Sequence, residues 1–119
     1  MSISVLAFSF DARNAVRLAH FWAQILHRSV TQGATEDFAS IAADTDSRLG
    51  PSLMFHKVPE GKTVKNRVHF DLTAADVQAE ADRLTSLGAQ QTRSLPENNG
   101  RWISFLDPEG NEFDLVASS

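Results

Sequence analysis

The sequence predicts an α+β protein built from two βαβββ modules. Hydrophobic residues alternate in several short segments, which indicates strands, and recur at three- and four-residue steps in two longer ones, which indicates helices. The order of one strand, one helix and three strands occurs twice along the chain. A polar segment, EGKTVKNR at residues 60–67, separates the two copies and is typical of a connector. One domain is therefore expected over residues 1–119, with module 1 at about 1–57, a connector at 58–67 and module 2 at about 68–119.

Module 1 begins with an alternating segment at residues 3–10, which predicts a strand with one apolar side. That side, expected to face the helix, consists of Leu6, Phe8 and Phe10. A helix is predicted at about residues 14–27, and its apolar stripe places Trp22 in the core. His27 stands at the end of this helix. Three short strands are then expected, at residues 29–32, 38–42 and 52–57.

Module 2 repeats this order. A strand is predicted at residues 68–73 and a helix at about 74–87. Thr73 begins a segment that resembles a capping box, with Asp76 in the place of the usual glutamate, and Gly88 suits the C-terminal cap. Three more strands are expected, at residues 90–94, 101–106 and 111–116.

The last strand follows a turn, Asp-Pro-Glu-Gly at residues 107–110, whose proline and glycine have the backbone preferences that turns require. Alternation then places Phe113 and Leu115 on one face and Asp114 on the other. A slip by one residue would expose both apolar side chains and bury the carboxylate without a partner, which is costly. The sequence therefore predicts that Asp114 faces away from the helix, on the same side as His69.

Composition excludes several classes of function. The net charge of −4 does not suit nucleic-acid binding, which needs a basic surface. There are no cysteines, so disulfides, thiolate metal sites and a cysteine nucleophile are excluded. No apolar run has the ~18 residues of a membrane span, and the N-terminus lacks a signal-peptide pattern. A cytoplasmic location, a small-molecule partner and a homodimer that covers open sheet edges are expected.

Three stretches resemble a known superfamily: FDARNAVRLAHFWAQIL, VPEGKTVKNRVHFDLTAADVQAEADRLTSLGA and RWISFLDPEGNEFDLV. They are similar to the glyoxalase, bleomycin resistance and extradiol dioxygenase proteins, the vicinal oxygen chelate superfamily, and most of all to its glyoxalase-like branch. The resemblance implies paired βαβββ modules that form an open, mostly antiparallel, barrel-like sheet around a cleft. It also implies that enzymatic members hold a divalent metal ion in that cleft.

Carried onto this sequence, the superfamily's first metal-ligand position falls on Ala7, or on Phe8 if the alignment slips by one residue. The other positions fall on Met54 or His56, of which strand parity favours His56, and on His69 and Asp114. Alanine cannot bind a metal ion, so a glyoxalase I with its usual four ligands is excluded. Two imidazoles and one carboxylate nevertheless suit Zn²⁺, Fe²⁺, Mn²⁺ or Ni²⁺. Metal binding by the three remaining residues and the absence of any metal both stay open at this point.

Each candidate ligand has an alternative role. His69 could hydrogen-bond within polar surroundings that include Asp71, and His56 could face water at a strand edge. Asp114 could pair with Arg101. Four further residues are expected to contact a small-molecule ligand, namely Met54, Arg67, Trp102 and Ser104. Among them, the tryptophan would hold an apolar or planar group, and the arginine belongs to a basic connector that would guide an anion.

Three functions agree with these residues. The first is a metal-dependent lyase, isomerase or dioxygenase-like enzyme that binds its substrate in the cleft between the modules, which the histidines and Asp114 favour. The second is a non-catalytic protein that sequesters a ligand or antibiotic, as bleomycin resistance proteins do, which Ala7 favours. The third is a metal-free enzyme or ligand sensor. Fold alone does not choose among them, and the catalytic residues and the substrate are not identified by the sequence.

Overall fold

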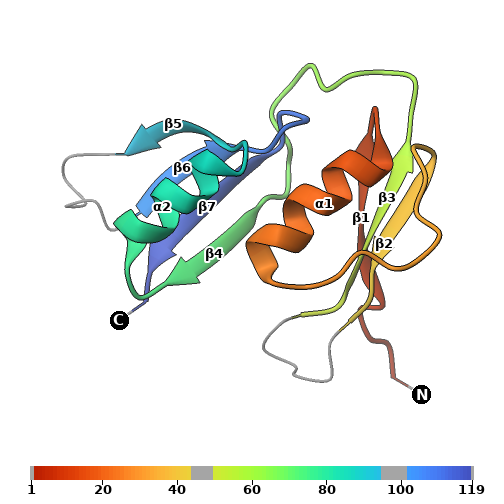
Figure 1. The fold of residues 1–119 in the computed structure, drawn as a ribbon, viewed down its shortest axis with the longest axis horizontal. Helices are drawn as coiled ribbons and strands as arrows, with labels where there is room; N and C mark the ends of the chain where they lie inside the picture. Colours follow the sequence, from red (N-terminus) through yellow and green to blue (C-terminus); the bar gives the residue numbers. More distant parts are fainter. Residues whose placement is uncertain (1, 44–49, 95–101, 119) are drawn as a thin grey trace. The chain divides into compact units, whose positions relative to one another are not determined.

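The computed structural model describes residues 2–43, 50–94 and 102–118 (Figure 1). In this range the chain forms two helices and seven strands, divided between two compact units, Met1–Gly61 and Lys62–Ser119. Each unit has one small sheet and one helix, so the predicted α+β class with two βαβββ-type modules is confirmed. The expected cleft between the modules, and their union in one domain, stay predictions.

Unit 1 contains a three-stranded sheet in the order β1-β3-β2. Strand β1 (Ala7–Ala12) runs parallel to β3 (Ser52–Lys57), and β2 (Phe38–Ile41) pairs antiparallel with β3. Helix α1 (Ala15–Leu26) covers one face of this sheet. Its core is aromatic, since the Phe10 ring stacks on Phe55 at 5.0 Å and lies 5.8 Å from Trp22. Trp22 is buried, as its helical position predicted.

Two details of unit 1 differ from the sequence prediction. Residues 29–32 do not form a strand; only Val30 pairs, through a single bridge to Ile41, because the chain turns at Gly33 with a φ of 94°. The first strand begins at Ala7 rather than residue 3, and Phe8 is 41% exposed. Leu6, which lies before the strand, is 77% exposed, so the predicted packing of Leu6 and Phe8 on the helix is wrong. The reason is that α1 packs mainly on β2 and β3; of the predicted face, Phe10 does contact Trp22.

The ends of α1 are both capped. The side chain of Asn14 accepts a hydrogen bond of 3.1 Å from the backbone N–H of Arg17, which satisfies one of the free donors of the first turn. At the other end, His27 adopts a left-handed conformation with φ 53° and ψ 44°. Glycine is the usual residue at such a position, because a side chain there crowds the backbone.

Unit 2 contains a four-stranded sheet in the order β4-β7-β6-β5. The strands are β4 (Phe70–Ala74), β5 (Gln90–Ser94), β6 (Trp102–Leu106) and β7 (Glu112–Ala117). The pairing of β4 with β7 is parallel and the other two are antiparallel. Helix α2 (Val77–Ser86) packs on β4 and β7. The core beneath it includes Phe105 and Phe113, whose rings stack at 5.4 Å.

The ends of α2 correct one prediction. The N-cap is Asp76, whose carboxylate accepts a hydrogen bond of 3.0 Å from the N–H of Ala79, and not Thr73, which lies in β4. Both residue types can cap a helix, and here β4 continues through Ala74, so the helix begins later. Gly88 follows the helix with φ 116°, as the predicted C-terminal cap requires. In the described part of the chain, neither helix has the length and apolar character needed to cross a membrane.

Candidate functional site

The site is built on the face of the unit 2 sheet that lies away from α2. Phe113 and Leu115 of β7 are buried on the helix side, so Asp114 between them projects from the opposite face, as predicted. Strand register places Asp71 of β4 directly beside it on one side and Ser104 of β6 on the other. One row across the sheet therefore carries two carboxylates and a hydroxyl.

His69 completes this cluster from the residue that immediately precedes β4. Its Nε2 atom lies 3.3 Å from Asp71 Oδ1 and 3.6 Å from Asp114 Oδ2. The side chains of His69, Asp71 and Asp114 are 35%, 64% and 25% exposed, so the cluster is open to solvent and Asp114 is its most sheltered member. His69 and Asp114 thus lie on the same side of the sheet, as predicted.

The three side chains fit a metal ion. Each offers one ligand atom, and these atoms all lie within 4.8 Å of one another. Ligands placed at about 2.0–2.2 Å from one ion are separated by roughly 3–4.4 Å, depending on the angle between them. The donor set, one imidazole and two carboxylates, is a common one for divalent transition metals. The two separations from His69 Nε2, 3.3 and 3.6 Å, fall in this range, so these three residues are a candidate site for a single divalent ion.

Sequence reasoning missed Asp71 as a third ligand candidate. The signal was available, because residues two apart on an extended chain share a face, and His69 and Asp71 have that spacing. His56, which was predicted instead, lies on β3 of unit 1, where its ring is 5.1 Å from Phe38. Its part in metal binding stays a prediction.

The predicted ligand-contacting residues divide between the units. On unit 2, Ser104 donates a hydrogen bond of 2.7 Å from its Oγ to Asp114 Oδ1. Trp102 is half-buried on the same face of β6 and is the register partner of the exposed Val116. Arg67 is exposed two residues before His69, and Met54 is half-buried on β3 of unit 1. The alternative pairing of Asp114 with Arg101 falls outside the described residues.

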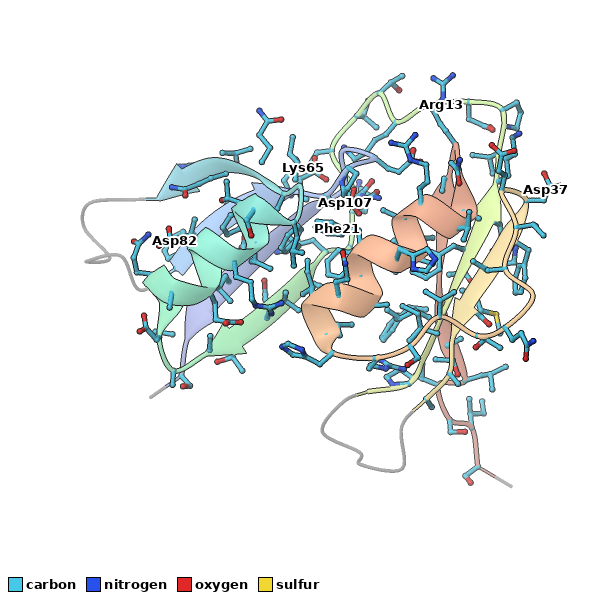
Figure 2. The ribbon with its side chains drawn as sticks, viewed as in Figure 1. Arg13, Phe21, Asp37, Lys65, Asp82 and Asp107 are labelled. Atoms are coloured by element: carbon cyan, nitrogen blue, oxygen red, sulfur yellow. The ribbon has the colours of Figure 1, made fainter. Side chains whose placement is uncertain are left out.

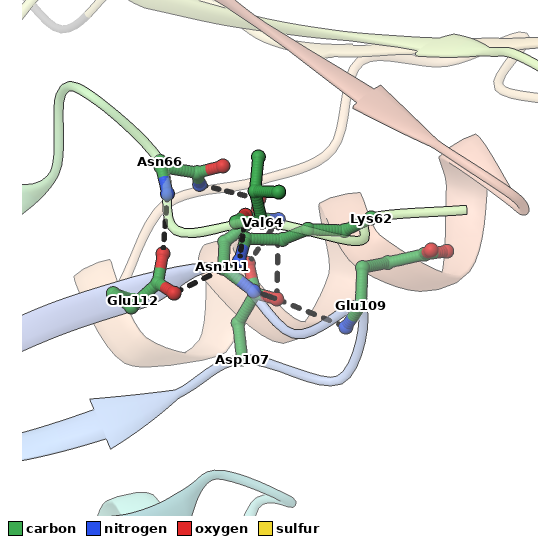
Figure 3. Close-up of polar contacts among 7 residues, drawn as sticks. All are labelled: Lys62, Val64, Asn66, Asp107, Glu109, Asn111 and Glu112. Carbon is green, nitrogen blue, oxygen red and sulfur yellow. Dashed lines mark hydrogen bonds and ion pairs between the residues drawn. The ribbon is translucent and has the colours of Figure 1, made fainter. Parts of the chain in front are cut away.

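Beside the cluster, the connector is attached to the start of β7 (Figure 3). The ammonium group of Lys62 lies 2.8 Å from Glu112 Oε2, and the backbone N–H of Asn66 donates a 3.0 Å hydrogen bond to Glu112 Oε1. Burial raises the pKa of the Glu112 carboxyl, but the hydrogen bonds from Lys62 and Asn66 and the lysine's charge outweigh it and lower the pKa to about 2. Glu112 is therefore an anion at neutral pH.

The turn before β7 supports this attachment. Asp107, which is only 4% exposed, accepts hydrogen bonds of 2.9 Å from the backbone N–H groups of both Glu109 and Asn111 (Figure 3). The side-chain amide of Asn111 donates to the same carboxylate, and its oxygen accepts a 2.8 Å hydrogen bond from the Asn66 amide. A buried carboxylate with several donors fixes a turn firmly.

A model of the glyoxalase-like domain family matches residues 7–116 of the chain. The chain belongs to the glyoxalase-like domain family. This match agrees with the vicinal oxygen chelate resemblance predicted from the sequence. No curated protein sequence matches this glyoxalase-like chain.

Solved structures share its fold at low sequence identity. The fosfomycin resistance protein FosX from Listeria monocytogenes, complexed with Mn(II) and sulfate, matches with a TM-score of 0.75 and 15% identity over 100% of this chain and 93% of that one. FosX from Mesorhizobium loti matches with a TM-score of 0.70 and 15% identity, covering 100% and 94%. A possible glyoxalase from Bacillus cereus matches with a TM-score of 0.71 and 14% identity, covering 97% and 99%.

Proposed function

We propose that this glyoxalase-like protein binds a divalent metal ion through His69, Asp71 and Asp114 and acts on a small molecule at that site. The observation that carries the proposal is the convergence of three ligand atoms within 4.8 Å on one sheet face. Two carboxylates beside one imidazole nitrogen give a local negative charge that favours a cation. All three residues lie in unit 2. The proposed ligand set therefore does not include Ala7 or His56, which belong to unit 1.

Mn(II) is the first ion to test. Carboxylate-rich sites that also contain histidine suit Mn(II) and Fe(II), and the FosX structure from Listeria monocytogenes that resembles this fold contains Mn(II). A bound ion of this kind would supply a Lewis acid that polarises an oxygen of the small molecule.

The chain's own residues would orient the ion's ligands and the small molecule. Ser104 holds Oδ1 of Asp114 and so leaves Oδ2 on the side of His69. Trp102 and Val116, one row further along the same face, offer apolar surface to a hydrocarbon part of the ligand. Arg67, exposed in the basic connector, would attract an anionic group.

The first experiment is a calorimetric titration of the full-length chain with Mn(II). We expect one ion per chain, with affinity reduced at least about tenfold in each of His69→Ala, Asp71→Asn and Asp114→Asn. Asp82→Asn is the matched control, because Asp82 is an exposed carboxylate on α2 of the same unit (Figure 2). His56→Ala tests a contribution from unit 1. The proposal fails if the first three variants bind like the wild type.

The second candidate is a protein that sequesters its ligand without turnover. Ala7 favours it, because this residue stands at a superfamily ligand position and offers no donor atom. The two candidates separate when the Mn(II)-loaded protein is incubated with small oxyanionic compounds, with fosfomycin as the first probe, and products are followed by mass spectrometry. Mn(II)-dependent consumption supports an enzyme, whereas tight binding without consumption supports sequestration. The homodimer and the cytoplasmic location stay predictions; light scattering at several concentrations tests the first.

A further inference from the structure

His69 occupies a position that strand pairing alone does not fix. The parallel ladder between β4 and β7 begins with Phe70 opposite Phe113, so His69 stands one residue before it. Its side chain is 35% exposed and is not packed in the core. A residue at a strand end, next to a polar segment, has considerable backbone freedom unless the preceding chain is held. The chain ahead of His69 is held at Lys62 and Asn66, through contacts with Asn111 and Glu112.

These residues, Lys62, Asn66, Asn111 and Glu112, form what we call the connector clamp (Figure 3). Glu112 receives Lys62 at one carboxylate oxygen and the Asn66 N–H at the other. The Asn66 and Asn111 side chains are joined by a 2.8 Å hydrogen bond. Lys62 also donates a 2.7 Å hydrogen bond to the carbonyl of Val64, which folds the connector back on itself.

The clamp joins the two segments that carry the proposed ligands. Asn66 lies three residues before His69, and Glu112 lies two residues before Asp114. On the β7 side the clamp has a firm base, because Asn111 is bound to the buried carboxylate of Asp107. Fixing Asn66 to this base therefore limits how far His69 can move from Asp114.

We propose that the connector clamp is a positioning device that holds His69 beside Asp114, an inference that rests on the proposed metal site. Lys62 and Glu112 are not among the proposed metal ligands. They act on metal binding through the position of His69. The competing interpretation is a purely structural ion pair. Partly exposed pairs of that kind usually add less than about 1 kcal/mol and would leave the metal affinity unchanged.

Lys62→Met provides the sharpest test, because a positioning role and a purely electrostatic role of Lys62 predict opposite changes in Mn(II) affinity. Lys62 pairs with Glu112, two residues from Asp114 on β7, so removing its positive charge should strengthen Mn(II) binding if only electrostatics matters. If the clamp positions His69, the same change should weaken Mn(II) binding by about tenfold, as losses of supporting partners at metal sites do. Lys62→Arg, which can keep the ion pair, should restore most of the affinity.

Arg83→Met is the matched control. It also removes one cation and one ion pair, since Arg83 lies 3.0 Å from Glu80, but on α2, on the other side of the sheet. Thermal unfolding of each variant confirms that it is folded. Weaker binding in Lys62→Met alone, with rescue in Lys62→Arg, supports the clamp. Unchanged or tighter binding in Lys62→Met overturns it and leaves the metal site intact.

A separate readout covers the case in which the wild-type protein binds no Mn(II), which would refute the proposed function. NMR then compares the imidazole resonances of His69 between the wild type and Lys62→Met, both free of metal. These resonances are assigned by their loss in His69→Gln. The clamp predicts that Lys62→Met shifts or broadens these resonances while those of His20, exposed on α1, stay unchanged. Identical His69 resonances in wild type and Lys62→Met would overturn the inference.

Discussion

Ser104 Oγ donates a 2.7 Å hydrogen bond to Oδ1 of Asp114, its register partner on the neighbouring strand. One carboxylate oxygen, Oδ1, therefore accepts this hydrogen bond, and the other, Oδ2, lies 3.6 Å from His69 Nε2. A carboxylate held in this way enters a metal site with its orientation already set, which reduces the cost of ordering it on binding.

Replacing Ser104 should therefore weaken metal binding without unfolding the protein. We expect Ser104→Ala to lower the Mn(II) affinity by about tenfold, because the Asp114 carboxylate would be free to rotate. Ser104→Thr keeps a hydroxyl and suits a strand, so it should bind Mn(II) nearly as well as the wild type. Calorimetric titration measures both variants. Equal affinity in Ser104→Ala and the wild type would show that the hydrogen bond does not orient the ligand.

The ionisation of Glu112 should contribute to stability in a defined pH range. Its pKa is lowered from 4.5 to about 2 in the folded protein. A carboxyl with a lowered folded pKa stabilises the protein above its unfolded pKa, and this contribution disappears as the pH falls through the folded value. The contribution of Glu112 to the free energy of unfolding is thus fully present above about pH 4.5 and is lost as the pH falls towards 2.

The Glu112→Gln variant isolates this effect from the titration of other carboxylates. Its free energy of unfolding should lie about 1–3 kcal/mol below that of the wild type at pH 6, because the neutral side chain loses the ion pair with Lys62 and also the charge-assisted hydrogen bond from the Asn66 N–H. This value is lower than the pKa shift alone implies, because Glu112 is partly exposed. The difference should shrink as the pH is lowered from 4.5 towards 2. Urea unfolding at several pH values measures it. A difference that stays constant over this range would contradict the assignment of the low pKa.

His27 ends α1 with a φ of 53°, in the left-handed region. We expect His27→Gly to stabilise unit 1 by about 1 kcal/mol, because glycine removes the crowding of the side chain against the backbone. His20→Gly is the contrasting variant. His20 lies inside the same helix, so glycine there should destabilise by about 1 kcal/mol. Thermal unfolding gives both values, and a loss of stability in His27→Gly would refute the strain argument.

The start of α2 gives a further test. Asp76→Ala should lower the free energy of unfolding by about 1 kcal/mol, because the N–H of Ala79 loses its acceptor. Thr73→Ala serves as the comparison, since Thr73 is exposed on β4 and does not cap the helix. Its effect should be smaller. If Thr73→Ala were the more damaging change, the capping box predicted from the sequence would be right after all.

Local sequence signals were sufficient for much of the fold. The strands at residues 52–57 and 90–94 have the predicted limits, because Pro51 and Gly88 mark their beginnings closely. Alternation around Phe113 and Leu115 was enough to orient Asp114. These inferences depend only on neighbouring residues, and they were correct.

Other features depend on long-range pairing that a single sequence does not contain. The spacing of His69 and Asp71 was enough to place them on one face, but the contact of Asp71 with Asp114 depends on the register of two strands more than 40 residues apart in the chain. Phe8 is exposed because α1 packs mainly on β2 and β3, which depends on how the helix lies on the sheet rather than on residue type. The connector clamp was also missed, since the polar residues of 60–67 were interpreted as a connector, and their contacts with Glu112 depend on pairing across the chain.

Metal binding by His69 together with Asp71 and Asp114 can be observed by pulsed electron paramagnetic resonance of the Mn(II)-loaded protein, because an imidazole nitrogen bound to Mn(II) gives a characteristic nuclear coupling. We expect a nitrogen coupling in the wild type that is lost in His69→Gln and retained in Asp82→Asn. Bound Mn(II) without such a coupling, or a coupling that persists in His69→Gln, would show that His69 is not a ligand.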